Sequence, residues 1–187
     1  MTVEVVNCIK PTHFKDFVQV PFQLHQQDEN WIPPLRLTIK KILSKKNPFF
    51  AQADVSLWVA YKDKKPLGRI AGIINKTHNQ FYQENTAFWG FFEAPNCDEI
   101  SDALFKTLET WAVDKKMLNL RGPMNPSINY ECGMQISAFE TQPFIMMPQN
   151  PAFYPKLVEQ QGYAKLIDLQ AWMVDMQDAH MDAKKIQ

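Results

Sequence analysis

Cysteine is scarce in this chain, with three residues among 187, Cys8, Cys97 and Cys132. An odd number of cysteines without any Cys-x-x-Cys spacing argues against a disulfide framework and against a structural zinc site. The 4 histidines are scattered along the sequence, so no metal-ligand spacing appears among them either. We therefore expect no bound metal and a reducing, cytoplasmic compartment.

An excess of charge and long hydrophobic runs are also missing. Twenty basic and twenty acidic residues cancel, which indicates neither a nucleic-acid backbone nor an anionic membrane as an obligatory partner. No segment approaches the roughly 18 apolar residues of a membrane span, and the first residues lack the pattern of a signal peptide. A local basic cluster, Lys40, Lys41, Lys45 and Lys46, is most simply the solvated end of a helix. The sequence predicts a soluble protein with no nucleic acid and no membrane among its partners.

The apolar content is sufficient for one folded domain. Residues of apolar type make up 45% of the chain and aromatic residues 12%, which fits a single globular core. No internal repeat or low-complexity tract interrupts it. We expect residues 1–176 to form this domain and residues 177–187 to be a polar tail or a truncated linker.

The spacing of apolar residues predicts alternating strands and helices. In chain order we expect a strand over 3–9, a helix after Pro11 that Pro21 kinks or restarts, and a helix around 35–43. A hairpin of strands 54–62 and 66–75 follows, and then a buried strand over 86–94. The remaining elements are a helix over 96–116 with Asn96 and Glu99 as its capping box, a strand over 117–121, a helix over 151–161 and a long strand over 163–176. Such an order requires a mixed sheet covered by helices on both faces.

A polar, turn-rich loop follows the strand that ends near residue 121. It reads Arg121-Gly-Pro-Met-Asn-Pro-Ser-Ile-Asn-Tyr-Glu-Cys-Gly133. Prolines, glycines and asparagines make this segment a poor helix or strand but a good rigid loop that presents hydrogen-bonding groups. Two interpretations stay open: a ligand-binding loop, or an ordered connection whose asparagines satisfy their own backbone.

The order of elements and several motifs resemble the GNAT superfamily of N-acetyltransferases. The segment from Asn150 to Tyr163 is similar to its closing motif, an asparagine and an alanine, then a tyrosine on the last helix, then a glycine-aromatic turn. More narrowly, the chain resembles the N-terminal half of a branch of bacterial GNAT-like proteins about twice this length. The motifs that carry this resemblance are Asn30-Trp-Ile-Pro-Pro-Leu35, Lys46-Asn-Pro-Phe-Phe50, Gly68-Arg-Ile-Ala71, His78-Asn79, Gly90-Phe-Phe-Glu93 and the loop from Arg121 to Gly133.

The resemblance implies an α/β (α+β) fold of the acyl-CoA N-acyltransferase type, with a central mixed β-sheet flanked by helices on both faces. It also implies transfer of an acetyl or acyl group from acetyl-CoA or another acyl-CoA to an amine of a small molecule or peptide. Two alternatives remain open. One is a non-catalytic GNAT-fold module for ligand binding or dimerisation, as a homodimer, that has lost the usual CoA pyrophosphate loop; the other is an aminoacyl transferase that uses charged tRNA.

The junction between the central strand and its helix decides between these functions. In active relatives a glycine-rich loop there holds the pyrophosphate of acetyl-CoA with its backbone N–H groups. The corresponding residues of this chain, 93–100, contain no glycine and no basic residue, and two acids in the first helical turn favour the helix dipole without an anion. The cofactor-binding candidates that the resemblance implies are Ala94, Asn96, Cys97 and Asn150.

Glu93 and Tyr154 are the catalytic candidates. Glu93 falls at the end of the central strand, where many relatives place a glutamate base, and we expect Trp89, Phe91 and Phe92 to desolvate it and raise its pKa. The other interpretation of Glu93 is a helix-capping or surface carboxylate. Tyr154 resembles the general acid of the superfamily, and its other interpretation is a tyrosine packed in the core.

Five further residues are candidates for binding the substrate. Arg121, Asn125, Asn129 and Glu131 belong to the loop that follows the neighbouring strand, where ligands of open sheets collect, and His78 precedes the central strand. An arginine suits a carboxylate or phosphate, and a glutamate suits an amine. Alternatively, Arg121 and Glu131 pair with each other, and His78 is structural.

Overall fold

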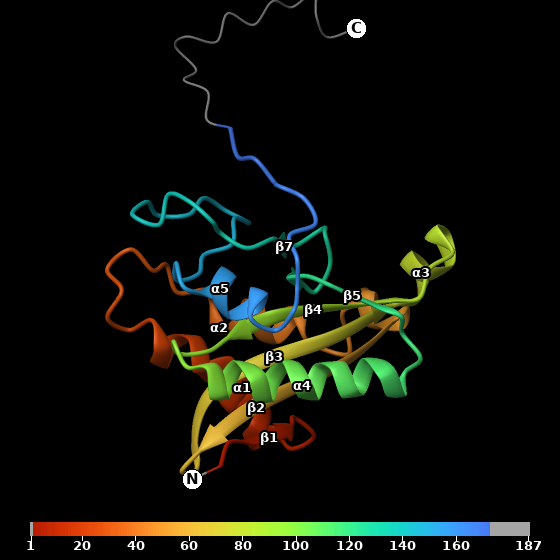
Figure 1. Cartoon of the computed structure of the whole chain (residues 1–187), viewed down its shortest axis with the longest axis horizontal. Helices are drawn as coiled ribbons and strands as arrows, with labels where there is room; N and C mark the ends of the chain where they lie inside the picture. The colour runs from red at the N-terminus through yellow and green to blue at the C-terminus, as the bar shows by residue number, and fades with distance from the viewer. Residues whose placement is uncertain (1, 173–187) are drawn as a thin grey trace, which may run out of the picture.

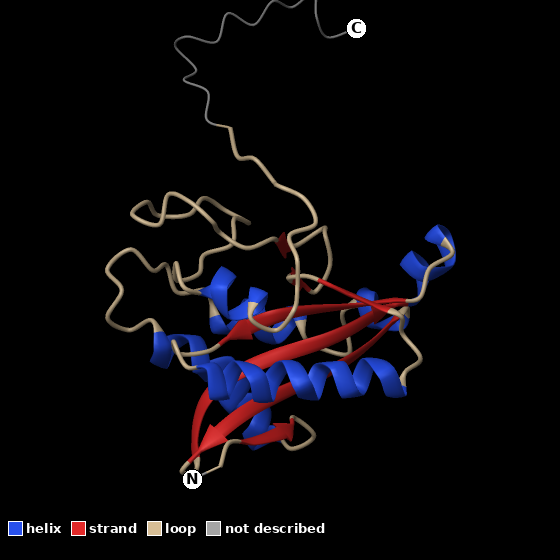
Figure 2. Ribbon diagram, viewed as in Figure 1, coloured by secondary structure: helices blue, strands red, loops and turns tan. Residues whose placement is uncertain are grey.

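A computed structural model describes residues 2–172 and shows a five-stranded sheet in the order β1-β2-β3-β4-β5 (Figures 1 and 2). The first four strands pair antiparallel, and β5 runs parallel to β4. The strands are β1 Glu4–Asn7, β2 Ala53–Lys62, β3 Lys65–Asn75, β4 Thr86–Glu93 and β5 Asn119–Arg121. The predicted mixed α/β fold is therefore confirmed.

Helices cover both faces of this sheet. Figure 1 shows α4 lying across one face, while α1 packs on the other against β2, β3 and β4. The helices are α1 Pro11–Leu24, α2 Arg36–Ile42, α3 Lys76–Tyr82, α4 Asp98–Asp114 and α5 Tyr154–Glu159, with a 3-10 turn, η1, at Pro48–Ala51. Among the described residues, no helix combines the length and the apolar character needed to cross a bilayer.

The core has two layers because side chains alternate across each strand. Trp58 and Ile70 face α4, whereas Val59 and Ala71 face α1. The close approach of α4 requires Gly72 in β3, since a Cβ there would lie 2.6 Å from the ring of Trp111. Both layers are closely packed, and this rigid sheet positions the residues at its strand ends.

A bulge interrupts β4 and changes which face its side chains occupy. The β3–β4 register shifts between Arg69 and Ala71, and Phe91 adopts a left-handed φ of 51°. As a result Trp89 packs on the α4 side while Phe91 packs on the α1 side, although residues two apart in a regular strand share a face. The bulge separates the part of β4 that pairs with residues 71–73 from Glu93, which pairs with Arg69.

Several predicted elements differ from the structure. The N-cap of α4 is Cys97 rather than Asn96, and Glu99 hydrogen-bonds Lys62 instead of completing a capping box. The α1 helix continues through Pro21 up to Leu24. Residues 76–82, a polar segment before the central strand for which no helix was predicted, form α3.

The C-terminal part of the prediction is also revised. The helix expected over 151–161 shortens to α5, and the long loop contains two paired strands, β6 Met124–Asn125 and β7 Glu131–Cys132. The strand expected over 163–176 is absent from 163–172, where no residue is paired in a sheet. Residues 173–176 and the predicted tail, 177–187, lie outside the described residues.

Candidate active site

The end of β4 is covered by the loop that begins after β5. A Cβ at Gly90 would lie 1.7 Å from the carbonyl oxygen of Met124, so only glycine allows this contact. The backbone N–H of Phe91, in the bulge, donates to Asn125 Oδ1 at 2.6 Å. Asn125 therefore lies at the predicted end of the sheet, where it holds the loop on β4.

Glu93 lies at the centre of a buried polar cluster beside this loop. Its Oε2 accepts hydrogen bonds from His25 Nε2 at 2.7 Å and from the Tyr154 hydroxyl at 2.8 Å, and its Oε1 accepts one from Arg69 at 3.3 Å. His25, Arg69 and Tyr154 are 6%, 5% and 2% exposed. The two predicted catalytic residues are thus in contact, and the carboxylate is surrounded by donors.

These donors reverse the expected shift in the pKa of Glu93. Burial acts to raise the pKa, but the hydrogen bond from His25, the charge of Arg69 and the hydrogen bond from Tyr154 outweigh it and hold the pKa below its ordinary value. The predicted rise is therefore wrong, because aromatic neighbours were considered without the partners from α1 and β3. Burial and the Glu93 charge raise the pKa of Tyr154 well above its ordinary value, so this hydroxyl stays protonated.

His25 is the member of the cluster with a ring nitrogen still available. It ends α1 as the C-cap residue, and its ring packs on Trp31 with 5.3 Å between centroids. Nε2 is engaged by Glu93, while Nδ1 has no hydrogen-bond partner within residues 2–172. Since an ionised carboxylate accepts the Nε2 proton, Nδ1 of the neutral ring is an acceptor.

The sequence did not identify His25 or Arg69 as site residues. Arg69 carries a usable signal, because it is a charged residue inside the otherwise apolar strand Leu67–Ile74, and a buried arginine needs a partner. Its second amino group donates to the carbonyl oxygen of Phe17 at 3.0 Å. His25 carries no local signal, since it meets Glu93 across 68 residues of sequence.

The loop contributes Glu131 and Asn129 in different ways. Glu131 in β7 pairs in register with Asn125. It is close enough to the Glu93 cluster for the charges of Arg69 and Glu93 to act on the pKa of Glu131. Loss of surrounding water raises the pKa of Glu131 above its ordinary value, although hydrogen bonding by Asn125 opposes the rise and its side chain still reaches the surface. Asn129 is exposed, and its backbone N–H donates to Ser127 Oγ at 3.3 Å.

Arg121 and His78 form a separate cluster around Glu84. Arg121 donates to Glu84 at 3.2 Å and His78 Nε2 lies 2.7 Å from the same carboxylate, so Arg121 does not pair with Glu131. Arg121 is opposite Phe88 in the β4–β5 ladder, before the bulge, whereas Glu93 follows it. The structure therefore does not bring Arg121 and His78 to the Glu93 cluster.

The junction from Ala94 to Cys97 does not fit a pyrophosphate. The N–H of Ala94 donates to the Tyr154 hydroxyl at 3.1 Å, and the N–H of Cys97 donates to the carbonyl oxygen of Pro95 at 2.7 Å. Asn96 is exposed and follows a proline that has no N–H. Two candidate donors are thus used within the chain, and the acids of the next turn repel an anion.

Asn150 holds the long loop rather than facing the junction. Its Oδ1 accepts from the backbone N–H of Gln135 at 2.7 Å, and its Nδ2 donates to the carbonyl oxygen of the same residue at 3.2 Å. Within the described residues, no group of histidine, cysteine or acidic side chains is arranged to hold a metal ion.

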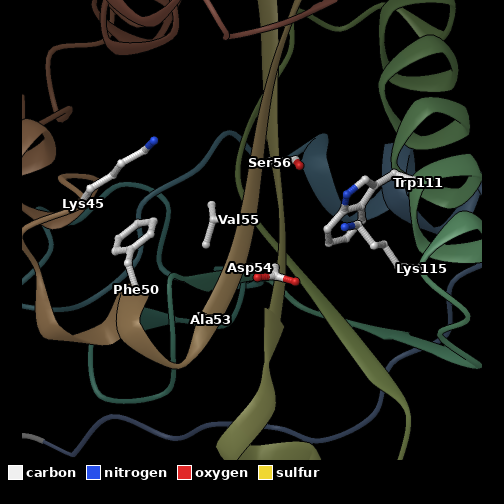
Figure 3. A pocket seen from close by; sticks show the side chains of 8 residues that line it. All are labelled: Lys45, Phe50, Ala53, Asp54, Val55, Ser56, Trp111 and Lys115. Carbon is white, nitrogen blue, oxygen red and sulfur yellow. The ribbon is translucent and has the colours of Figure 1, made fainter.

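An open hollow of about 400 Å³ lies at the end of the sheet opposite to Glu93, where β2 begins. Figure 3 shows Phe50 and Val55 on one side of β2, with Ser56 and Trp111 on the other. Its lining includes none of the predicted site residues. We place the candidate site at Glu93 because buried, hydrogen-bonded ionisable groups converge there.

The arrangement of a bulged β4, a parallel β5 and helices on both faces is the GNAT fold. One solved structure that shares it is an aminoglycoside acetyltransferase from an uncultured soil metagenomic sample, with a TM-score of 0.52 and 9% sequence identity. That match covers 93% of this chain and 96% of the acetyltransferase. Another is a ribosomal-protein-alanine N-acetyltransferase from Brucella melitensis, with a TM-score of 0.51 and 11% identity, over 94% of this chain and 99% of that chain. The predicted resemblance is confirmed for the fold.

Two curated proteins are similar in sequence. Protein YghO of Escherichia coli K12 is 36% identical over 164 residues, which cover 88% of this chain and 42% of YghO. A bacterial ceramide synthase of Caulobacter vibrioides is 33% identical over 175 residues, 92% of this chain and 46% of the synthase. The chain therefore spans about half the length of the curated relatives it matches. No family model matches it.

Proposed function

We propose that this chain is the acyltransferase part of an N-acyltransferase that joins an acyl group from a thioester to an amine. The observation that carries the proposal is the hydrogen bond between His25 Nε2 and Glu93 at the end of β4. A neutral imidazole oriented by a carboxylate is a suitable general base near neutral pH. The GNAT fold and the similarity to a ceramide synthase support the reaction type.

The base in this proposal is His25, and Glu93 positions it. A carboxylate that accepts three hydrogen bonds and has a lowered pKa is a weak base toward an ammonium group. Glu93 instead fixes the tautomer in which Nδ1 of His25 accepts a proton, as a carboxylate does in other histidine-based sites. Tyr154 and Arg69 hold the Glu93 carboxylate in place.

The chemical step then balances without a further co-reactant. The amine nitrogen attacks the thioester carbonyl carbon, a C–N bond forms, and Nδ1 of His25 takes the proton that the nitrogen loses. The C–S bond breaks, and the thiolate receives this proton from His25. A thiol resembling that of cysteine, with a pKa of about 8.5, leaves readily near neutral pH, so a separate acid is not needed.

The acceptor we favour is the amine of a long-chain amino alcohol. Ceramide is an amide of a fatty acid with such an amine, and the synthase from Caulobacter vibrioides is named for making it. The donor is acyl-CoA or another acyl thioester, because residues 94–97 supply no cradle specific for the pyrophosphate of CoA. A non-catalytic binding module is the competing function, and this poor cradle is what favours it.

The test measures thiol release from palmitoyl-CoA by the full-length protein with a long-chain 2-amino alcohol. We expect His25→Gln to lower kcat by roughly 10²–10⁴-fold, which is the usual contribution of a general base. The acid limb of the wild-type pH profile should also disappear in His25→Gln, whereas a purely structural defect would lower activity equally at every pH.

The matched control is His13→Gln on the same helix. His13 is half-buried and away from the Glu93 cluster, with Nδ1 3.2 Å from the carbonyl oxygen of Asn7, so its replacement should leave the pH profile unchanged. Thermal unfolding of both variants separates loss of fold from loss of the base. Normal turnover by a folded His25→Gln variant would remove His25 from the mechanism, and no turnover by the wild type with any acyl-CoA would favour the binding module.

A further inference from the structure

Large apolar side chains are exposed in two segments, the connection that follows Trp31 and the part of the long loop that precedes Gln149. We call these six residues the apolar lip: Ile32, Leu35, Leu37, Phe144, Ile145 and Met146, with exposed fractions of 47%, 74%, 73%, 71%, 95% and 57%. Single exposed apolar residues are common, but a group of this size next to a site usually marks an interaction surface.

The two segments that carry the apolar lip are joined by hydrogen bonds near Ile32. Gln149 Nε2 donates to the carbonyl oxygen of Asn30 at 2.8 Å, and the N–H of Ile32 donates to Gln149 Oε1 at 3.0 Å. This pair of hydrogen bonds ties the end of the long loop to the connection between α1 and α2. Trp31 lies between the bonded residues and packs on His25, so the Ile32 end of the apolar lip adjoins the proposed base.

Positive charge flanks the apolar lip. Between residues 30 and 53 the sequence has no acidic residue. It has five exposed basic residues, Arg36, Lys40, Lys41, Lys45 and Lys46, on α2 and directly after it. Exposed leucines beside lysines and arginines on a short helix are typical of a segment that lies in the interface of an anionic bilayer.

We infer that the apolar lip and the five basic residues dock this protein on the surface of an anionic phospholipid bilayer. The inference rests on the proposed function, because a long acyl chain or amino alcohol partitions into membranes and must reach His25 from there. It departs from the prediction of no membrane partner, in which the basic cluster was only a solvated helix end. A formal net charge of zero is compatible with docking, because the positive charges are concentrated on and after α2.

Vesicle sedimentation with the full-length protein tests this inference. The probes are vesicles of phosphatidylcholine alone and vesicles in which phosphatidylglycerol replaces part of it. We expect binding to the anionic vesicles that weakens with salt, and a partition coefficient reduced roughly tenfold or more by Leu35→Ser with Leu37→Ser. Lys40→Glu with Lys41→Glu should remove most of the dependence on phosphatidylglycerol.

The matched control replaces equally exposed apolar residues far from the site. Val113→Ser with Leu118→Ser changes side chains that are 71% and 80% exposed near the end of α4, and should leave vesicle binding unchanged. The inference would be overturned if the Val113 and Leu118 changes weakened vesicle binding as much as the Leu35 and Leu37 changes do. Absence of vesicle binding by the wild type would also overturn it. A wild-type dimer that the Leu35 and Leu37 changes convert to a monomer, without vesicle binding, would assign the lip to a second copy instead.

Turnover of short-chain, water-soluble substrates distinguishes the two proposals. If vesicle binding fails while His25-dependent turnover persists, only the docking inference fails. If the vesicles are bound as expected but no acyl transfer occurs with soluble or vesicle-borne substrates, the proposed function fails and the docking surface remains.

Discussion

Replacing Glu93 with glutamine should strongly destabilise the protein. The amide group would put a donor where the carboxylate now accepts from Arg69 or from His25 and Tyr154. Arg69 is 5% exposed and its Nε already lacks a partner within the described residues, so it cannot turn to water. Removing one member of a buried ion pair costs about 3–5 kcal/mol, a large part of the roughly 5–15 kcal/mol that stabilises a typical domain.

Urea unfolding, followed by tryptophan fluorescence, measures this loss and its dependence on pH. The pKa of Glu93 in the folded protein is below the ordinary value of 4.5. Its contribution to the free energy of unfolding is therefore complete above that ordinary value and is lost as the pH falls through the lower, folded pKa. The difference between wild type and Glu93→Gln should be largest near neutral pH and should shrink in acid.

Glu99→Gln provides the matched control. Glu99 also pairs with a cation, Lys62, but these two side chains are 46% and 33% exposed, so water screens the pair. Such surface pairs contribute little, and we expect only a small change in the urea midpoint. If Glu93→Gln were no more destabilising than Glu99→Gln, or if its effect did not change with pH, the interpretation of Glu93 as an ionised, buried acceptor would be refuted.

Two substitutions and one labelling experiment test the packing around the sheet. Gly90→Ala places a Cβ 1.7 Å from the carbonyl oxygen of Met124, a steric clash that should displace the loop after β5. We expect a clearly lower thermal midpoint and altered backbone chemical shifts in this loop. Cys8 should react slowly with iodoacetamide at pH 8 until urea unfolds the protein, because burial raises the pKa of its thiol from 9.0 to about 12; rapid labelling of the folded protein would contradict this. Asn79→Ala removes both hydrogen bonds to the backbone of buried Thr86 and should cost about 1–3 kcal/mol, with faster hydrogen exchange at the Thr86 amide.

The sequence predicted the sheet well where local patterns determine it. The β2–β3 hairpin has a mostly apolar segment on each side of a polar turn, and its turn residues Asp63 and Lys64 take the left-handed conformation that two-residue hairpins require. The α4 helix was predicted from apolar residues at helical spacing, and those residues form its buried face. These patterns are local, so they need no knowledge of the rest of the chain.

The helix α3 was missed because no stripe of apolar residues marks it. Its seven residues contain no buried side chain. It is held by the Asn75 side chain, which accepts from the N–H of His78, and by Asn79, which bonds the start of β4. The first is a local N-cap bond and the second spans seven residues, and neither can be recognised from apolar periodicity.

The composition of the site was predicted only in part for a similar reason. The contact between Glu93 and Tyr154 follows from the resemblance, because both belong to motifs with a known place in the fold. The location of Arg121 depends instead on the register of β5 against β4, which pairs it with Phe88 rather than with the end of the strand. A shift of a few residues in a parallel register separates two predicted neighbours completely, and no motif specifies that register.

Tyr154 connects the Glu93 cluster with the junction between β4 and α4, the two parts of the candidate site. Its hydroxyl donates to Glu93 and accepts from the N–H of Ala94, so the same oxygen fixes the carboxylate and occupies a donor of the junction. An anion that bound the Ala94 N–H would have to displace this oxygen, which would remove one of the three donors that hold Glu93. Binding at the junction and the orientation of His25 are therefore opposed in the described arrangement. An acyl thioester held away from the junction avoids this conflict, and the apolar lip next to Trp31 offers such a route for a long acyl chain.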